Sequence, residues 1–317
     1  MNPIPIMKCH GSENTFFLID ALDLPENFSM TQRAQLSQLL CKQTAHWDGA
    51  DGILIMEAGN TSKYQMRIYN ADGSEALMCG NGMRIAGRWA LEQENTAATT
   101  VENITGLVYA IEKDTAYYPN ITATAIDFPV ANFQGNAFIN GIANELFHQK
   151  TIPQFHEAYK FTAVAMPNPH IVAIVEDIDM EALALIGAEA NERKNVFPEG
   201  VNVSFVLKKG ANHLFVATYE RGVGLTNACG TAMIASTITM NLANEILKNE
   251  WIIVQNKGGF IKVKIAEDWS TIMIGNANYV FKSNLIALDL EKEAFEIDQQ
   301  IYFNDEISAY ETLKANL

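Results

Sequence analysis

Short runs of hydrophobic residues, broken by polar and turn-forming residues, recur along the chain and predict a protein built mostly from β-strands. The early runs are rich in β-branched and aromatic residues and cover residues 16–20, 52–57, 64–70 and 107–113. Later runs of the same kind cover residues 161–166, 170–177, 201–209, 213–222, 260–268 and 270–280. No run approaches the roughly 20 apolar residues that a membrane-spanning helix requires.

Helical spacing of apolar residues occurs in four stretches, at residues 29–43, 82–95, 179–190 and 231–247. The first stretch begins with Ser29, a candidate N-cap. The second and fourth are rich in small and apolar residues, and we expect both helices to be buried. Strands interspersed with these helices indicate an α+β fold.

The two buried helices follow related segments, "CGNGM" at residues 79–83 and "CGTAM" at residues 229–233. A tyrosine lies ten residues before each cysteine, and a Val-x-Asn-x-x-Gly segment follows each helix. Farther upstream, Asn14 and Asn168 each precede an apolar strand. Because these features keep the same order in both parts of the chain, the sequence predicts a duplicated unit with one cysteine-led helix in each copy.

Composition narrows the class of protein. A chain of 317 residues that is 48% hydrophobic can form two cores, and its formal net charge of −15 disfavours nucleic acid and anionic membranes as partners. The first 20 residues lack the pattern of a signal peptide, and four cysteines in this length do not suggest a disulfide scaffold. We therefore expect a soluble protein of the cytoplasm.

A cysteine at a helix N-terminus lies beside free backbone N–H groups and the positive end of the helix dipole. Both effects favour the thiolate and are expected to lower the cysteine pKa, and the same N–H groups suit a carboxylate. If two such helix ends face one cleft, a substrate carbon next to its carboxylate has one sulfur on each face. One sulfur can then remove the α-proton and the other can return a proton, which inverts the configuration.

Five ordered motifs, "HGSENTFFLID", "YNADGSEALMCGNGMR", "MPNPH", "GVNVSF" and "YERGVGLTNACGTA", resemble those of the diaminopimelate epimerases. These pyridoxal-phosphate-independent enzymes interconvert LL- and meso-diaminopimelate. The resemblance runs from about His10 to Gly275 and implies an α+β fold of two pseudo-symmetric halves, each a β-barrel-like sheet around a central helix. We assign residues 1–127 and 276–290 to the half with Cys79, residues 128–275 to the half with Cys229, and residues 291–317 to an acidic C-terminal extension, expected to be a solvated surface segment.

The resemblance also implies roles for particular residues. It makes Cys79 and Cys229 the acid–base pair, with His170 and Glu220 close enough to tune their protonation. The positions expected to bind substrate are Gly80, Asn81, Gly230 and Thr231 for the α-carboxylate, Asn14, Asn70, Asn168 and Asn202 for other contacts, and Arg221 with Glu220 for the distal end. Arg221 is expected to pair with a distal carboxylate. The resemblance implies an amino-acid substrate, no cofactor, no metal and a possible homodimer.

Three departures from the family motifs affect the expected substrate pocket. The common "HGLGNDF" is "HGSENTF" here, Gly52 stands in place of a substrate-contacting glutamine, and "GTA" follows the second cysteine instead of "G-[ST]-G". Other hypotheses are therefore a racemase of another amino acid, such as histidine, a non-catalytic amino-acid-binding protein, or a thiol redox protein with a reversible Cys79–Cys229 disulfide. Cys9 and Cys41 are interpreted as core residues.

Overall fold

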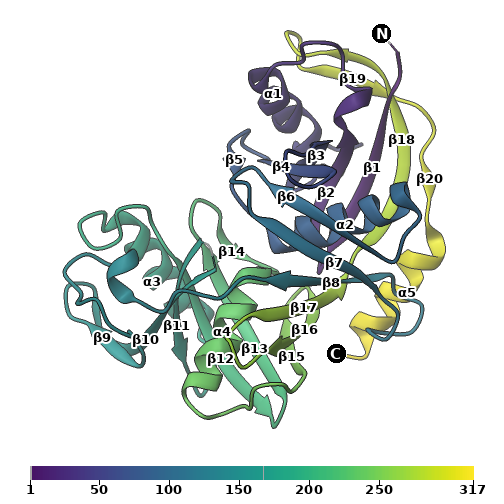
Figure 1. The fold of residues 1–317 in the computed structure, drawn as a ribbon. Helices are drawn as coiled ribbons and strands as arrows, with labels where there is room; N and C mark the ends of the chain where they lie inside the picture. Colours follow the sequence, from purple (N-terminus) through teal and green to yellow (C-terminus); the bar gives the residue numbers. More distant parts are fainter. Residues whose placement is uncertain (1, 167) are drawn as a thin grey trace. The chain divides into compact units, whose positions relative to one another are not determined.

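Two units make up the chain in the computed structural model, Met1–Ile126 with Ile274–Leu317, and Asp127–Met273 (Figure 1). The structure describes residues 2–166 and 168–317, so Pro167 of the "MPNPH" motif lies outside the described residues. Within the described ranges, no helix is long and apolar enough to cross a bilayer.

Helix α2 (Gly80–Glu94) is the central helix of the first unit and contacts strands on several sides (Figure 1). The surrounding strands are β1 (Ile4–Gly11), β2 (Asn14–Asp20), β3 (Gly52–Ala58), β4 (Tyr64–Asn70), β5 (Glu75–Ala76), β6 (Ala98–Asn103), β7 (Val108–Asp114) and β8 (Ala123–Phe128). Helix α1 (Met30–Cys41) packs on β3 and β4. Its buried Leu36 and Leu40 join Phe17, Trp47 and Phe281 in one hydrophobic core.

Helix α4 (Gly230–Leu242) has the same place in the second unit, where every residue from Gly230 to Met240 is buried. The strands of this unit are β9 (Lys150–Ile152), β10 (His156–Met166), β11 (Asn168–Ile174), β12 (Asn202–Gly210), β13 (His213–Glu220), β14 (Gly224–Thr226), β15 (Ile252–Asn256), β16 (Gly259–Ile265) and β17 (Thr271–Asn276). Helix α3 (Met180–Glu192) packs on β12 and β13 and contributes Leu183 and Ile186 to a separate core.

The strand pairings of the two units follow one scheme. In the first unit, β2 pairs parallel with β3, β3 pairs antiparallel with β4, and β4 pairs parallel with β6. In the second unit, β11, β12, β13 and β15 repeat these three pairings in the same order and sense. In each unit a short strand, β5 or β14, pairs with the third of these strands, β4 or β13. The cysteine-led helix follows this short strand in the chain. The duplicated unit predicted from the sequence is therefore confirmed.

Several predicted boundaries need correction. The helix predicted over 231–247 ends at Leu242, and Asn244 adopts the left-handed conformation (φ 60°) that commonly terminates helices. The strand predicted over 270–280 is two strands, β17 and β18 (Asn278–Asp289), which separate where the Ala277 N–H donates to the carbonyl of Thr122.

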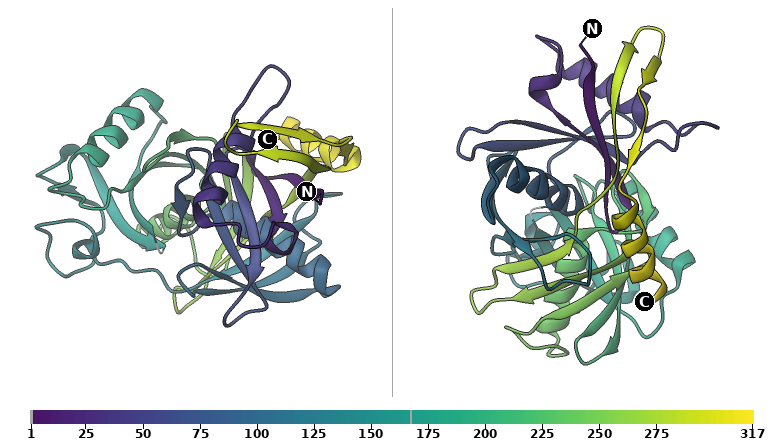
Figure 2. Two further views of the ribbon diagram at one scale, coloured as in Figure 1. Left: turned by 90° about the horizontal axis from the view of Figure 1, so that it is seen from above. Right: turned by 90° about the vertical axis from the view of Figure 1, so that its right-hand side faces the viewer.

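The C-terminal extension also differs from the expected solvated segment. It forms β19 (Ala294–Ile297) and β20 (Ile301–Tyr302), which pair with β18, and helix α5 (Asn304–Ala315), which packs on β18 (Figure 2). The side chains of Tyr310 and Leu313 on this helix are buried.

Candidate active site

Cys79 is the N-cap of helix α2, with an extended backbone (φ −141°, ψ 116°). Its sulfur accepts a hydrogen bond from the backbone N–H of Gly82 at 3.4 Å. This N–H belongs to the first turn of the helix, where backbone donors have no partner within the helix. The sequence-based placement of Cys79 at a helix start is confirmed, although the helix begins at Gly80, two residues earlier than predicted.

Asn14, the first residue of β2, lies directly beside this thiol. Its Oδ1 accepts from the Cys79 thiol at 3.7 Å and from Asn81 Nδ2 at 3.2 Å. Its Nδ2 donates to Asp51 Oδ2 at 3.1 Å, and Thr15 N–H donates to the same oxygen at 2.7 Å. Since Asp51 binds the amide nitrogen, the amide oxygen of Asn14 is directed toward Cys79. The sequence analysis missed Asp51, although it directly precedes Gly52, one of the positions that depart from the family motif.

Arg84, also missed, lies fully buried in the second turn of α2. Its Nε donates to the carbonyl of Asn276 at 3.0 Å, and its Nη2 donates to Ser12 Oγ at 3.1 Å. Burial lowers the pKa of Arg84, and the charges of neighbouring tyrosines and of Cys79 act in the opposite direction. The attraction is mutual, so a guanidinium within the helix favours the ionised form of Cys79. The available signal was an arginine among small and apolar residues in the first two turns of the helix, Gly80–Gly87.

Cys229 is the N-cap of helix α4, and its sulfur lies 3.6 Å from Thr231 Oγ1. Burial raises the pKa of Cys229 well above its usual value, and the negative charge of Glu220 adds to the shift. The expectation that a helix N-terminus lowers the cysteine pKa is therefore wrong for Cys229, because desolvation of the thiolate outweighs the dipole. The carboxylate of Glu220 accepts from Thr226 Oγ1 at 2.6 Å.

A chain of polar side chains connects His170 to this cysteine. His170 Nε2 lies 3.1 Å from Asn168 Oδ1, and Asn168 Nδ2 donates to Thr231 Oγ1 at 3.3 Å. Burial, followed by the charge of Arg221, lowers the pKa of His170 to about 3. The imidazole is therefore neutral at neutral pH, and Asn168 connects it to Thr231, which lies beside Cys229.

Asn14 and Asn168 hold equivalent places in the two units. Each begins the strand that pairs in parallel with the next, and each bonds to the residue two positions after its unit's cysteine, Asn81 or Thr231. The correspondence of the two copies therefore extends from the backbone to the side chains around each cysteine.

The remaining predicted residues occupy the ends of strands. Asn202 is buried at the start of β12, and its Oδ1 accepts from the backbone N–H of Arg221 at 2.9 Å. Nη1 of Arg221 donates to the carbonyl of Glu199 at 2.9 Å. Asn70, the last residue of β4, donates to Ser74 Oγ at 2.9 Å. The first unit thus carries Asn14, Asn70, Cys79, Gly80 and Asn81, and the second carries Asn168, His170, Asn202, Glu220, Arg221, Cys229, Gly230 and Thr231.

Comparison with known proteins gives consistent matches. The sequence profile of the family described as diaminopimelate epimerase matches residues 6–120 and 162–280. The diaminopimelate epimerase of Clostridium acetobutylicum is 37% identical over 312 residues, covering 97% of this chain and 92% of that protein. The diaminopimelate epimerase of Ligilactobacillus salivarius is 36% identical over 325 residues, covering 98% and 99%.

Solved structures of more distant proteins share the fold. A hydroxyproline epimerase from Agrobacterium vitis has a TM-score of 0.64 at 13% identity and covers 92% of each chain. A phenazine biosynthesis protein of the PhzF family from Bacillus anthracis has a TM-score of 0.63 at 15% identity, covering 90% of this chain and 100% of that one. At this level of identity the similarity establishes the architecture, which agrees with the predicted α+β fold of two pseudo-symmetric halves.

Proposed function

Because the chain belongs to the diaminopimelate epimerase family, we propose that it is an isomerase that interconverts LL- and meso-diaminopimelate by proton transfer between two cysteines. The observation that carries the mechanism is the repeated setting of Cys79 and Cys229. Each begins the central helix of its unit, and each lies beside the residue that bonds to a strand-start asparagine.

The proposed reaction divides the proton transfer between the two thiols. A thiolate on one face of the substrate removes the α-proton, and the thiol on the other face donates a proton to the resulting carbanion. The N–H groups at the two helix starts, with Asn81 and Thr231, hold the α-carboxylate and stabilise the charge that develops on it. Neither cysteine is consumed: the base leaves the step as a thiol and the acid as a thiolate, and proton exchange with solvent restores the starting protonation.

In this proposal, a residue of the second unit binds the distal end of the substrate. Arg221 is the candidate partner for a distal carboxylate, since a guanidinium can bind a carboxylate through two parallel hydrogen bonds. Asn70, Asn168 and Asn202 supply further amide groups. All four cysteines are free thiols, and the mechanism requires Cys79 and Cys229 to stay reduced, which suits the cytoplasm.

The test is to incubate the purified, reduced protein with LL-diaminopimelate in deuterium oxide and to follow inversion and deuterium at Cα. We expect meso-diaminopimelate to form with deuterium at the inverted carbon. Parallel reactions with histidine, proline and hydroxyproline test the alternative substrates. Inversion of one of these amino acids with none of diaminopimelate would overturn the substrate, and binding without exchange at Cα would overturn the enzymatic role.

A further inference from the structure

The C-terminal extension folds back onto the half-site of Cys79. The family profile matches the chain only as far as residue 280, yet the residues after it continue β18, add β19 and β20 and end in helix α5 (Figure 2). Two groups of contacts connect α5 to the first unit, one to helix α2 and one to the turn between β1 and β2 that precedes Asn14.

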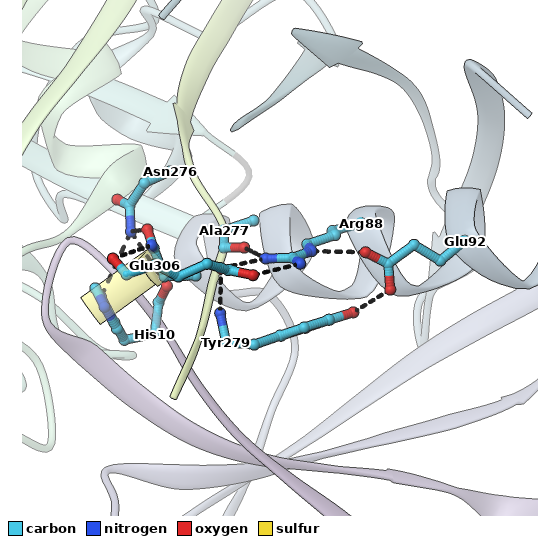
Figure 3. Close-up of polar contacts among 8 residues, drawn as sticks. His10, Arg88, Glu92, Asn276, Ala277, Tyr279 and Glu306 are labelled. Carbon is cyan, nitrogen blue, oxygen red and sulfur yellow. Dashed lines mark hydrogen bonds and ion pairs between the residues drawn. The ribbon is translucent and has the colours of Figure 1, made fainter. Parts of the chain in front are cut away.

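The first group centres on Glu306, in the first turn of α5 (Figure 3). Its carboxylate accepts two hydrogen bonds from Arg88 of helix α2, at 2.7 and 2.8 Å, and one from the backbone N–H of Tyr279 at 2.9 Å. Arg88 is buried and lies 3.6 Å from the centre of the Tyr279 ring. Although burial opposes the charge, the hydrogen bonds that Arg88 donates to Glu306 raise the pKa of Arg88, so the pair is ionic. Glu306 therefore fixes α2, the helix that Cys79 begins, against β18.

The second group holds the turn between β1 and β2. Ser12 and Glu13 in this turn both have left-handed backbones, with φ of 53° and 63°. Residues other than glycine rarely adopt this conformation unless surrounding contacts stabilise it. Lys314 of α5 forms an ion pair with Glu13. The ring of Tyr310 packs edge-on against His10, with ring centroids 4.5 Å apart. His10 Nδ1 in turn accepts from the Glu13 N–H at 3.4 Å.

We propose that helix α5 is a positioning element for Cys79, in which Glu306 fixes the catalytic helix while Tyr310 and Lys314 fix the turn that presents Asn14 to the thiol. Glu306, Tyr310 and Lys314 are positioning residues that act through Arg88, His10 and Glu13. This inference rests on the proposed role of Cys79.

The alternative is that α5 only packs on the core as a terminal helix, and this hypothesis predicts a different result. The Lys314–Glu13 pair is partly exposed, with 39% and 33% of the two side chains accessible, and such pairs contribute little to stability. If α5 only covered the core, removing this pair would change neither kcat nor the rate at which Cys79 is alkylated. If α5 sets the position of Asn14, the loss of the pair frees the turn next to Cys79 while the fold remains intact.

The test compares Lys314→Met with Lys314→Arg and with the control Lys292→Met, which removes an exposed lysine paired with Asp289 in the same extension. In Lys314→Met we expect kcat to fall about tenfold with little change in KM, below the roughly 100-fold cost of a 1 Å misplacement. We expect Cys79 in the same variant to react faster with iodoacetamide, since Asn14 no longer covers the thiol or accepts its hydrogen bond. Lys314→Arg should restore both values, and Lys292→Met should match the unmodified protein.

Destabilisation of the whole fold would also speed alkylation of the buried Cys9 and Cys41, so a slower reaction with faster alkylation of Cys79 alone distinguishes a loss of positioning from it. A Lys314→Met protein with unmodified kcat and unmodified Cys79 alkylation would overturn the inference. So would a Glu13→Gln/Lys314→Met double variant that is clearly slower than Lys314→Met, because the two residues would then act independently. Glu306→Gln provides a second measurement through Arg88, with the same two changes expected if it folds.

The two proposals can fail separately. If the unmodified protein inverts no amino acid, the proposed function fails, while alkylation of Cys79 still reports whether α5 holds the turn. If the unmodified protein is active and the Lys314 variants are indistinguishable from it in both measurements, only the role of α5 fails.

Discussion

The two cysteine-led helices share a backbone plan but differ in the charges buried beside them. Helix α2 contains two buried arginines, Arg84 and Arg88, whereas helix α4 contains no charged residue from Gly230 to Leu242. The charge that acts on Cys229 is instead negative, the carboxylate of Glu220, which raises the pKa of the thiol. Ile234 in α4 occupies the position that corresponds to Arg84 in α2.

This difference shows how a duplicated unit can supply two different functional groups. A two-cysteine inversion needs one thiolate and one thiol at the start of each turnover. The guanidinium in α2 favours ionisation of Cys79, while burial and Glu220 raise the pKa of Cys229. We therefore expect Cys229 to carry the proton in the resting enzyme, which leaves Cys79 as the base. The following predictions test whether the two halves differ in this way.

The largest expected effect is the loss of either cysteine. Cys79→Ala and Cys229→Ala should each slow inversion by about 1000-fold, since a positioned acid or base contributes roughly 100- to 10,000-fold. The remaining cysteine can still exchange the α-proton on its own face. Each variant should thus incorporate deuterium into only one stereoisomer, and the two variants should prefer opposite isomers. Chiral chromatography with mass spectrometry measures both quantities, and Cys9→Ala is the control.

The second prediction concerns the arginine that distinguishes the helices. Arg84→Met removes the donors to the buried Asn276 carbonyl and to Ser12, so we expect the free energy of unfolding to fall by about 1–3 kcal/mol. The pH midpoint of Cys79 alkylation should rise, because a cation that favours the thiolate is lost, whereas any release of the turn at Ser12 would increase the limiting rate at high pH. Ile234→Met is the matched control in α4 and should leave both values close to the native ones. An unchanged pH midpoint of Cys79 alkylation in Arg84→Met would remove Arg84 from the explanation.

Local sequence patterns predicted the helix starts at the two cysteines and the order of the repeated strands, because apolar spacing and turn residues act over a few positions. They missed α5, where only Tyr310 and Leu313 are buried and the apolar stripe is correspondingly weak. They also missed the partners of Arg84, since Asn276 lies 192 residues away in the chain. The sequence could not predict the raised pKa of Cys229 either, because burial of the thiol depends on the packing of segments that are distant in the chain.

Each unit also buries one histidine, and their effect on stability at acid pH is the third prediction. Burial first, then nearby cations, lowers the pKa of His170 to about 3 and that of His10 to about 4, from 6.5 in the unfolded chain. Below pH 6.5 the unfolded state binds the additional protons, so stability falls as pH falls, until each folded pKa is reached. Each histidine should account for about 1.4 kcal/mol per pH unit. Urea unfolding between these pH values should show a shallower slope for His170→Gln, and an unchanged slope would contradict this assignment.

The smallest expected effect separates Glu220 from burial as a cause of the high pKa of Cys229. A neighbouring carboxylate disfavours a thiolate, so Glu220→Gln should lower the pKa of Cys229 and move formation of its thiolate to lower pH. Thiolate absorbance in a Cys79→Ser background can follow this titration. The background also carries Cys9→Ala and Cys41→Ala, because burial raises the pKa of both thiols, that of Cys41 to about 12, and their thiolates would form in the same alkaline range as that of Cys229.

The control for this titration is Glu189→Gln, which removes an exposed carboxylate of the same unit that pairs with Arg193. It should leave the Cys229 titration unchanged. If Glu220→Gln also leaves it unchanged, burial alone keeps Cys229 protonated. The difference between the halves would then depend on Arg84 in the first unit and on packing in the second, and not on opposite charges beside the two thiols.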